Sequence, residues 1–480
     1  MLPAVSALSS PTSTQRLLDS ARRHIIRYHG LADELDPPVL SRGLGSLVWD
    51  SDGNEYVDFV SGQICATVGH SHPAILAAIK EAGAKMIHAN DFMLCDDAIA
   101  LAERLAAVLP ATLSKFVFKS TGSESNEAAI YMAKIHTGGY EVVAPQRSFH
   151  GMTSAPRGAT YSYGHRGHGP AAPGQYAIPV PYPYRCPIRH CDGRCDCTCL
   201  DVGFDLYDTQ SEGRPAAFIV EPILSAGGLI DPPLEWFERL HAKVRERGML
   251  LIVDEAQTAP GRLGALFGFE QFGVVPDILT LSKCIGGGLP LSAVATSAEI
   301  EQDCFDKRFI MGSSHTNDPL PACVGLAVLD VIEREDLVAQ AAEKGERLRR
   351  GLLELAERHE LVGDVRGRGL LQGIELVRDR DTKEPAEDEG AVFNRACLDR
   401  GLIGNVVRMP GQLSICRVAP PLTITTDELD RGLHVFDEAL TVATESMARP
   451  RPPRAAQAIA DATPGCSCSE GSCCAESSDA

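Results

Sequence analysis

Residues 276–291 read PDILTLSKCIGGGLPL, a short apolar run that ends at a lysine, Lys283, and continues into three glycines. The run DILTLS is typical of a buried strand, because strands covered on both faces are apolar along their whole length. Comparable runs occur at KFVFKS (115–120), AAFIVEP (216–222), MLLIVDEA (249–256) and SAVATS (292–297), with helical stretches between several of them. This alternation predicts an α/β fold with a mostly parallel sheet covered on both faces. Chemistry on such sheets gathers at the carboxyl ends of the strands, where Lys283 stands.

The chain is long enough for more than one domain, with 480 residues. We expect an N-terminal segment at 1–65 that packs with a smaller domain, a large domain at 66–325, a small α+β domain at 326–447, and a disordered, cysteine-rich tail at 448–480. The small domain is indicated by the strand-like stretches GDVRGRGLLQGIEL (363–376) and SICRVAPPL (414–422). The tail is biased toward Pro, Ala and Ser, which is typical of disorder.

Composition and charge exclude several classes of partner. The net charge of -19 and the pI of about 5.2 argue against nucleic-acid binding, which depends on clustered Lys and Arg. No apolar run is long enough to span a bilayer, and the N-terminus lacks the pattern of a secretory signal. We therefore predict a cytoplasmic protein with neither nucleic acid nor membrane as a partner.

The 16 cysteines fall into three sets. Seven lie among apolar residues and are expected to be core side chains. Four are in the tail stretch CSCSEGSCC (466–474), and five lie in RCPIRHCDGRCDCTCLD (185–201), namely Cys186, Cys191, Cys195, Cys197 and Cys199. Neither cluster has the two separated CxxC pairs of a structural zinc site, which favours a surface loop and a disordered tail. Metal, redox or disulfide chemistry is the alternative, in its extreme form a non-catalytic metal- or redox-responsive protein.

Polar residues at strand ends carry the candidate chemistry. Lys283 is either a lysine that reaches the surface or an amine that forms a Schiff base with a carbonyl. Asp254 and Glu255 close a run of buried aliphatic residues, where a carboxylate needs a partner. That partner is either a capping or salt-bridge group, or the protonated ring nitrogen of pyridoxal phosphate.

The stretch STGSESNEAAI (120–130) opens a helix directly after a strand. Its small residues expose backbone N–H groups at the positive end of the helix dipole, which suits a phosphate. The alternative is an ordinary helix start capped by Ser123 with Asn126 and Glu127.

Together these motifs resemble the class III, fold-type I pyridoxal-phosphate aminotransferases. The resemblance covers roughly residues 20–445 and rests on STGSESNEAAIYMAK (120–134), FHGMT (149–153), EPILSAGG (221–228), DEAQTAPGRLG (254–264), LTLSKCIGGGLPL (279–291) and SSHTNDPLP (313–321). It implies a large domain with a mostly parallel sheet of the seven-stranded type and a smaller α+β domain.

The resemblance also implies roles for single residues. Lys283 would hold pyridoxal 5'-phosphate and move a proton, Asp254 would pair with the pyridine nitrogen, and Gln257 would bond the ring hydroxyl. Arg417 would bind a substrate carboxylate. The remaining implied cofactor contacts are Thr121, Gly122 and Ser123 at the phosphate, Phe149 on the ring, and Ser314 from a second subunit. That last contact implies a homo-oligomer, at least a dimer with shared active sites.

The stretch DFVSGQICATVGHSHP (58–73) resembles the 2,2-dialkylglycine decarboxylase branch of this family. There the residue matching Gln63 holds the carboxylate that leaves, which implies a decarboxylating transaminase for substrates such as 2-aminoisobutyrate, with a 2-keto acid such as pyruvate as acceptor. A conventional aminotransferase without decarboxylation is the alternative. Ala226 replaces an expected serine beside Arg417. The branch further implies an alkali-metal site at Asp91, Ser314, Thr316 and Asp318.

Overall fold

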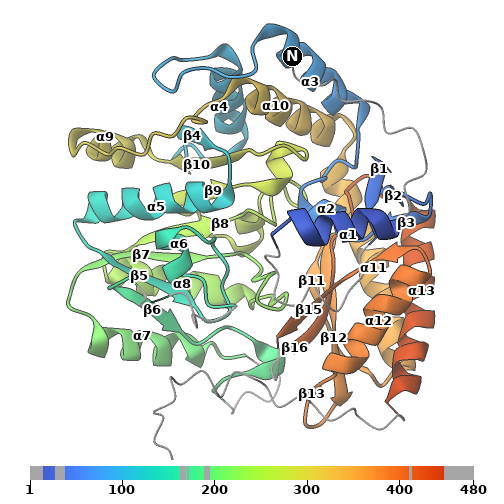
Figure 1. Ribbon diagram of the computed structural model, residues 1–480. Helices are drawn as coiled ribbons and strands as arrows, with labels where there is room; N and C mark the ends of the chain where they lie inside the picture. Colours follow the sequence, from blue (N-terminus) through green and yellow to red (C-terminus); the bar gives the residue numbers. More distant parts are fainter. Residues whose placement is uncertain are drawn as a thin grey trace, which may run out of the picture.

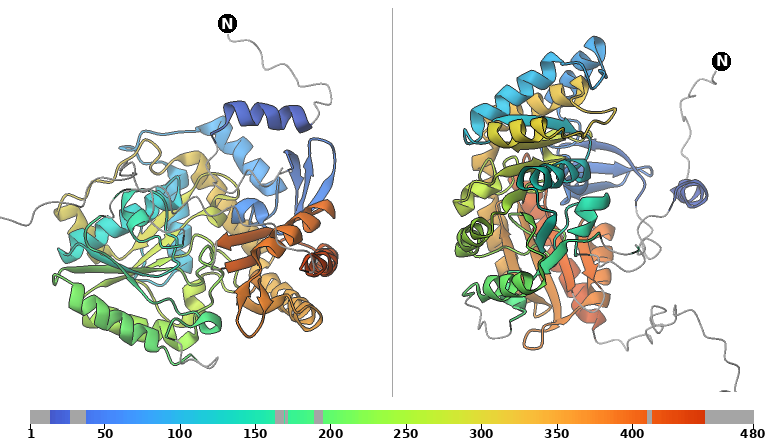
Figure 2. Two further views of the ribbon diagram at one scale, coloured as in Figure 1. Left: turned by 60° about the horizontal axis from the view of Figure 1, so that its bottom comes forward. Right: turned by 90° about the vertical axis from the view of Figure 1, so that its left-hand side faces the viewer.

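A computed structural model describes residues 14–26, 38–162, 169, 172–188, 195–409 and 413–447. Two bodies lie side by side in it, a large α/β unit and a smaller unit built from the C-terminal part of the chain (Figures 1 and 2). The predicted tail at 448–480 lies outside the described residues, as does Cys191. The predicted division into four segments stays a prediction. Among the described residues, no helix combines the length and apolarity that a bilayer crossing demands.

A seven-stranded sheet forms the centre of the large unit, in the spatial order β4-β10-β9-β8-β7-β5-β6. Its strands are β4 (Lys115–Lys119), β5 (Glu141–Pro145), β6 (Gln175–Ile178), β7 (Pro215–Val220), β8 (Leu250–Asp254), β9 (Ile278–Leu281) and β10 (Ser292–Thr296). Only β10 runs antiparallel to its neighbours β4 and β9; the other strand pairs are parallel. The predicted α/β class and mostly parallel sheet are confirmed.

Both faces of this sheet are covered, because successive side chains of each strand point to opposite faces. Ile252 packs with helix residues on one face, whereas Leu251 and Val253 belong to the core on the other. Helices on the first face include α5 (Gly122–Thr137), α6 (Ser154–Gly158) and α9 (Ala298–Asp306), and those on the second include α4 (Asp96–Val108), α7 (Thr198–Gln210) and α8 (Leu234–Glu246). The strands are apolar on both sides for this reason.

The smaller unit holds an antiparallel sheet in the order β11-β12-β16-β15, with β13 (Glu384–Pro385) paired to β12. Its strands are β11 (Val362–Arg368), β12 (Leu371–Asp379), β15 (Asn405–Met409) and β16 (Leu413–Val418). Cys416 and Val418 face a core shared with the helices α11 (Leu337–Arg358), α12 (Glu387–Asp399) and α13 (Thr426–Ser446). The period of two therefore turns Arg417 to the opposite face, toward the large unit.

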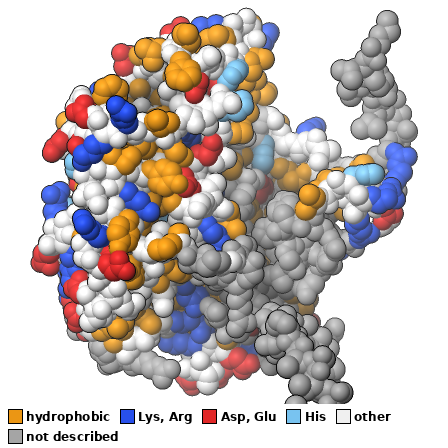
Figure 3. All heavy atoms as spheres, turned by 60° about the vertical axis from the view of Figure 1, so that its left-hand side comes forward, with side chains coloured by type: hydrophobic (Ala, Val, Ile, Leu, Met, Phe, Trp, Pro, Cys, Tyr) orange, Lys and Arg blue, Asp and Glu red, His pale blue; other side chains and the backbone are white. Residues whose placement is uncertain are grey.

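Segments near the N-terminus join the small unit to the large one. A four-stranded sheet contains β1 (Leu40–Leu44), β2 (Leu47–Asp50), β3 (Glu55–Asp58) and β14 (Leu402–Ile403), of which β14 pairs in parallel with β3. The short segment α2 (Ser61–Ile64) follows β3, and α3 (Pro73–Lys85) packs on α10 (Pro319–Arg334). The helix α1 (Thr14–His24) has no buried residue. On the face in Figure 3, acidic and basic side chains are interspersed.

Candidate active site

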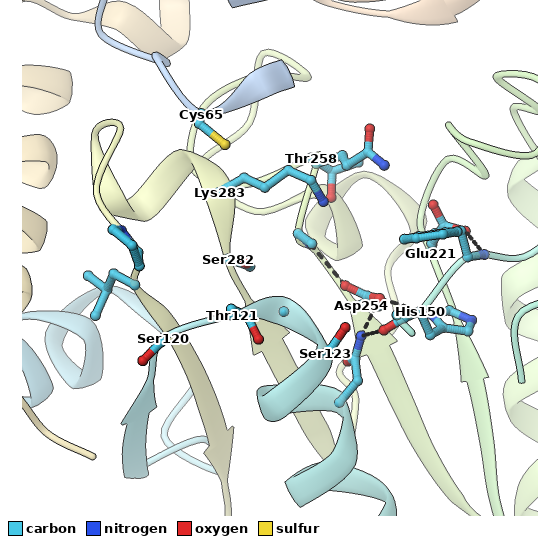
Figure 4. A pocket seen from close by; sticks show the side chains of 18 of the residues that line it. Cys65, Ser120, Thr121, Ser123, His150, Glu221, Asp254, Thr258, Ser282 and Lys283 are labelled. Carbon is cyan, nitrogen blue, oxygen red and sulfur yellow. Dashed lines mark hydrogen bonds and ion pairs between the residues drawn. The ribbon is translucent and has the colours of Figure 1, made fainter. Parts of the chain in front are cut away.

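A cavity of about 360 Å³ opens where the carboxyl ends of β7, β8 and β9 meet the start of α5. Seven of the residues predicted to bind the cofactor line it: Thr121, Gly122, Ser123, Phe149, Asp254, Gln257 and Lys283. Figure 4 shows Lys283 and Cys65 on one side of this hollow, with Asp254, Thr121 and Ser123 on the other. Residues that are 162 positions apart, such as Thr121 and Lys283, are thus brought to one place.

Lys283 begins a short 3-10 turn, Lys283–Gly286, directly after β9. Its φ of 41° lies in the left-handed region, which costs a residue other than glycine on the order of 1–3 kcal/mol. Gly287 continues this turn with a φ of 54°, and a Cβ there would lie 2.8 Å from a methyl group of Val328. The glycines after Lys283 therefore allow a tight reversal against α10, and the strained lysine is held with its amine at the cavity.

Asp254 ends β8 and is only 3% exposed. Its Oδ2 accepts two hydrogen bonds, from Asn126 Nδ2 at 2.7 Å and from His150 Nδ1 at 2.9 Å. Thr280 Oγ1 donates to Asn126 Oδ1 at 2.7 Å, which fixes the orientation of the Asn126 amide. A buried carboxylate is stabilised by such charge-assisted hydrogen bonds. Three supporting residues thus surround Asp254 that we did not predict for it.

The start of α5 is not capped by Ser123 with Asn126 and Glu127, the alternative that the sequence suggested. Thr121 is the N-cap and forms a reciprocal capping box with Glu124, whereas Asn126 is turned inward to Asp254. The first N–H groups of a helix have no partner within the helix, and Gly122 and Ser123 stand in this turn at the cavity wall. A Cβ on Gly122 would lie 3.2 Å from Ser282 Oγ, so glycine keeps this wall open.

Glu221 follows β7 and accepts hydrogen bonds from the backbone N–H groups of Phe149 at 2.9 Å and Ser225 at 3.3 Å. Burial, with the charge of Asp254 added to it, raises the pKa of Glu221 to about 8. Glu221 is therefore mostly neutral at neutral pH. The hydrogen bond from the Phe149 backbone to Glu221 also fixes the segment that carries Phe149 at the cavity wall.

Arg417 reaches the edge of this site from β16 and is 3% exposed. Its Nη1 donates to Gln257 Oε1 at 3.1 Å and to Ser225 Oγ at 3.3 Å, and its Nη2 donates to Gln63 Oε1 at 3.3 Å. All three acceptors are neutral. Ala226 was expected to deprive the guanidinium of a serine hydroxyl. Ser225, one residue earlier in the chain, supplies such a hydroxyl instead.

Gln63 lies in an unusual turn in which Ser61–Ile64 all have a φ between 45° and 68°. Left-handed residues other than glycine are costly, so a run of them needs strong support. Asp58 gives that support: its Oδ2 accepts from the backbone N–H of Gly62 and from His70 Nε2, each at 2.8 Å. The strained turn holds the exposed Gln63 side chain against Arg417.

Among the residues predicted for an alkali-metal ion, Asp318 and Thr316 have protein partners of their own. Ser314 is exposed, and Asp318 is engaged by two imidazoles, His88 Nδ1 and His315 Nδ1, each at 2.6 Å. Thr316 Oγ1 accepts a 2.8 Å hydrogen bond from the buried ammonium of Lys119, which also donates to Met311 O.

The fourth predicted ligand lies close to the same loop. Asp91 Oδ2 stands 3.2 Å from the place where a Cβ on Gly312 would be, and its charge acts on Lys119. Burial lowers the pKa of Lys119 from its usual value, and Asp91 opposes that shift. A lysine that we did not predict therefore donates to Thr316, and the charges of Glu124 and Asp91 act on it.

The lining of the cavity fits pyridoxal phosphate. An amine, a buried carboxylate supported by two donors, and an open helix N-terminus face the same hollow. These are the groups that a carbonyl, a protonated ring nitrogen and a phosphate need. The residues that would hold the cofactor are Lys283, Asp254, Gly122, Ser123 and Phe149.

Comparison with known proteins agrees with this arrangement. The family model described as aminotransferase class-III matches residues 32–440. An uncharacterized aminotransferase of Schizosaccharomyces pombe is 44% identical over 441 residues, which is 90% of this chain and 98% of the relative. A leucine/methionine racemase of Thermococcus litoralis is 36% identical, covering 84% of this chain and 90% of the relative. An omega transaminase of Pseudomonas jessenii, solved in complex with PMP, superposes with a TM-score of 0.83 at 28% identity, covering 89% of this chain and 98% of that one.

Proposed function

The chain belongs to the class III aminotransferase family, and from this premise we propose that it moves the amino group of an amino acid to a 2-keto acid without obligatory decarboxylation. The proposal rests above all on one observation: Lys283, Asp254 and the start of α5 line one cavity, and Arg417 contacts Gln257 of that cavity. Pyridoxal phosphate, when bound, supplies the electron sink that makes bonds at Cα of an attached amino acid labile.

The chain's own residues control the proton and the charges. The Lys283 amine takes the proton that leaves Cα and returns it elsewhere, as a general base and then a general acid. Asp254, held by Asn126 and His150, keeps a proton on the ring nitrogen and so maintains the electron demand of the cofactor. Because Glu221 is mostly neutral, it contributes little negative charge near Asp254.

Arg417 binds the carboxylate shared by both substrates. A guanidinium matches a carboxylate with two parallel hydrogen bonds, and Gln257, Gln63 and Ser225 orient this one. One carboxylate site then serves the amino acid and the 2-keto acid in turn.

Decarboxylation of 2,2-dialkylglycines is the second candidate, and the strained turn at Gln63 is the observation that favours it. A structure holds a residue in such a turn when the position of its side chain matters. In the described structure, however, the oxygen of the Gln63 amide accepts from Arg417 and from Asn405 Nδ2 at 3.5 Å. Gln63 thus acts on the arginine, which supports transamination more directly.

The active unit is a dimer of two copies of this chain. Large apolar side chains are exposed beside Ser314: Ile87, Phe92, Met93, Leu94 and Ile310 are each at least 61% exposed. The loop that carries most of them is joined to the Ser314 loop by contacts of His88 with Asp318 and of Cys95 with the Asn317 carbonyl. An apolar patch of this kind marks a protein interface. Ser314 at its edge then reaches the phosphate end of the partner's cavity.

Product analysis tests the reaction. The holoenzyme is incubated with L-alanine or with 2-aminoisobutyrate, each with a 2-keto acid, and keto products, carbon dioxide and the chirality of recovered alanine are measured. Transamination predicts a new keto acid from L-alanine and no gas. Ketone and gas from 2-aminoisobutyrate, with little turnover of L-alanine, would establish the decarboxylating alternative. Loss of chirality without a keto product would instead indicate a racemase.

Sedimentation of the holoenzyme tests the dimer. Phe92→Asp together with Leu94→Asp should produce monomers with little activity, since two charges then enter the buried interface. Leu206→Asp, at a 53% exposed position on α7, is the control and should remain dimeric. A wild-type monomer with full activity would disprove the shared site.

A further inference from the structure

Three cysteines of the stretch 185–201 lie together at the start of α7. Cys197 and Cys199 are 1% and 4% exposed and belong to the core on that face of the sheet, while Cys195 is half-buried at its edge. Cys197 is the residue before the helix and has a φ of 61°, which turns the chain back on itself. The sulfur of Cys195 thereby comes within hydrogen-bonding contact of the sulfurs of both Cys197 and Cys199.

The surroundings make Cys195 the thiolate of the three. The Cys199 thiol donates to it, the backbone and thiol of Cys197 add further hydrogen bonds, and together they lower the pKa of Cys195 to about 6 despite its partial burial. The same hydrogen bond, with burial, raises the pKa of Cys199 far above its usual value. Cys195 is therefore charged and reachable, whereas Cys199 is protonated and enclosed.

Charged and polar groups from the neighbouring elements act on this cluster as well. The carboxylate of Asp196, next in the chain, disfavours a negative charge on the Cys195 sulfur. The carboxylate of Glu235 on α8 disfavours one on the Cys197 sulfur. Arg239 of α8 favours a charge on Cys197 and donates to the carbonyl of Asp196. The indole Nε1 of Trp236, also on α8, is buried and has no oxygen or nitrogen acceptor. It interacts with the Cys199 sulfur and favours the thiolate form of Cys199.

We propose that Cys195 is a hydroperoxide-reactive thiolate and that Cys199 resolves its oxidised form as a Cys195–Cys199 disulfide. This site is distinct from the cavity at Lys283, since α7 packs on β6, the outermost strand of the sheet. A reactive, accessible thiolate next to a resolving cysteine is the arrangement of a reversible redox site.

The chemistry balances in two steps. The Cys195 sulfur attacks one oxygen of the hydroperoxide, the O–O bond breaks, and the other oxygen leaves as hydroxide or alkoxide. Cys195 is thereby oxidised to a sulfenic acid, and the peroxide is reduced to water or an alcohol. The Cys199 sulfur then attacks the Cys195 sulfur, an S–S bond forms and the S–O bond breaks, and the departing hydroxide takes the Cys199 proton to give water.

A metal ion is a less suitable occupant of this cluster. Among the residues that the structure describes, the three sulfurs do not all come within 4.8 Å of one another, as ligands of one ion would. Cys195 instead stands between the other two. A central thiolate with a neighbour on each side suits the making of one disulfide.

Peptide mapping after mild peroxide treatment tests the proposal. Trypsin does not cleave the Arg214–Pro215 bond, so cleavage after Arg194 and Arg239 places all three cysteines in the peptide 195–239, which holds no other cysteine. The expected product is this peptide with an internal disulfide and with Cys197 as its one alkylated cysteine, reversed by dithiothreitol. A Cys195–Cys197 disulfide, a bond to any other cysteine, or an unreacted peptide would overturn the proposal.

Variants and rates separate the two roles. Cys195→Ser should abolish the disulfide, Cys199→Ser should leave a sulfenic acid at Cys195 that dimedone traps, and Cys186→Ser, at a half-buried position of the same stretch, should change nothing. Alkylation of Cys195 should rise with pH through a midpoint of about 6. Near neutral pH it should be several-fold faster than for an ordinary thiol, because the larger thiolate fraction outweighs the lower nucleophilicity. Zinc binding that blocks alkylation of all three thiols would show a metal site instead.

Discussion

Arg417 Nη2 and Gln63 Oε1 lie 3.3 Å apart although 354 residues separate them in the chain. The contact joins the small unit, which carries Arg417 on β16, to the strained turn after β3. In this contact the amide oxygen of Gln63 accepts a hydrogen bond from the Arg417 guanidinium. We therefore infer that these two residues, both predicted to bind substrate carboxylates, act together in recognition.

We predict that Gln63→Ala weakens binding of every carboxylate substrate rather than stopping one reaction. Removing one hydrogen bond from the guanidinium costs about 1–2 kcal/mol, which corresponds to a roughly tenfold rise in KM with a smaller change in kcat. Steady-state kinetics with L-alanine and with 2-aminoisobutyrate measure this. A selective loss of carbon dioxide release, with KM for L-alanine unchanged, would assign Gln63 to a leaving carboxylate instead.

Asn126→Ala should weaken the cofactor site without touching Lys283. Asp254 then loses a hydrogen bond to a charged acceptor, worth about 1.5–3 kcal/mol, so cofactor affinity is expected to fall by roughly 10- to 100-fold. Titration of the apoenzyme with pyridoxal phosphate, followed by absorbance, provides the measurement. Thr280→Val is the matched variant, because it removes only the bond that orients Asn126, and its effect should be smaller and in the same direction. Equal affinity in all three proteins would contradict the role of Asn126.

Lys283→Ala is expected to remove the covalent attachment of the cofactor and to reduce turnover by orders of magnitude, since the same amine moves the proton. The absorption band of the lysine-linked cofactor should disappear, while cofactor that is bound without the link should still be detected after gel filtration. Retention of the band and of most of the activity would disprove the site.

Glu221 should make stability fall as pH rises. Its pKa is raised from 4.5 to about 8, so the folded chain holds a proton between these values that the unfolded chain has released. The free energy of unfolding therefore decreases by about 1.4 kcal/mol per pH unit in that window, relative to Glu221→Gln, which cannot ionise. Denaturant unfolding of both apoproteins between about pH 5 and about pH 8 measures the difference.

Glu255→Gln serves as a comparison for that experiment. Burial raises the pKa of Glu255 to about 7, so the relative decrease should end about one pH unit earlier than for Glu221. Parallel pH profiles for wild type and Glu221→Gln would show that Glu221 titrates normally.

Lys119→Met tests whether the lysine substitutes for an alkali-metal ion near Thr316. The wild-type enzyme should have the same activity and melting temperature in sodium and in potassium salts, because the ammonium already bonds Thr316 and Met311. The variant, which lacks this cation beside Asp91, should become less stable and sensitive to the choice of ion. A wild-type enzyme activated by one alkali ion would support the predicted metal site.

Local sequence determined several strands of the large-domain sheet, its mostly parallel character and the residues at its strand ends. Buried strands are uniformly apolar, so a lysine or an aspartate that closes such a run stands out, and both lie at the sheet edge where parallel strands end together. Lys283, Asp254 and the start of α5 were predictable for this reason, whereas seven strands were implied only by the family resemblance.

Tertiary structure decided which residues support them. Asn126, whose local pattern suggested a helix cap, instead turns inward to Asp254. Ser225 rather than Ala226 contacts Arg417, and the Lys119 ammonium donates to Thr316, one of the residues predicted for an alkali ion. Each of these contacts joins segments far apart in the chain, and its geometry depends on side-chain packing that no local pattern encodes. The physical reason is general. The pattern of neighbouring residues along the chain is enough to favour a strand, but a hydrogen bond between distant side chains forms only where folding places its donor and acceptor next to each other.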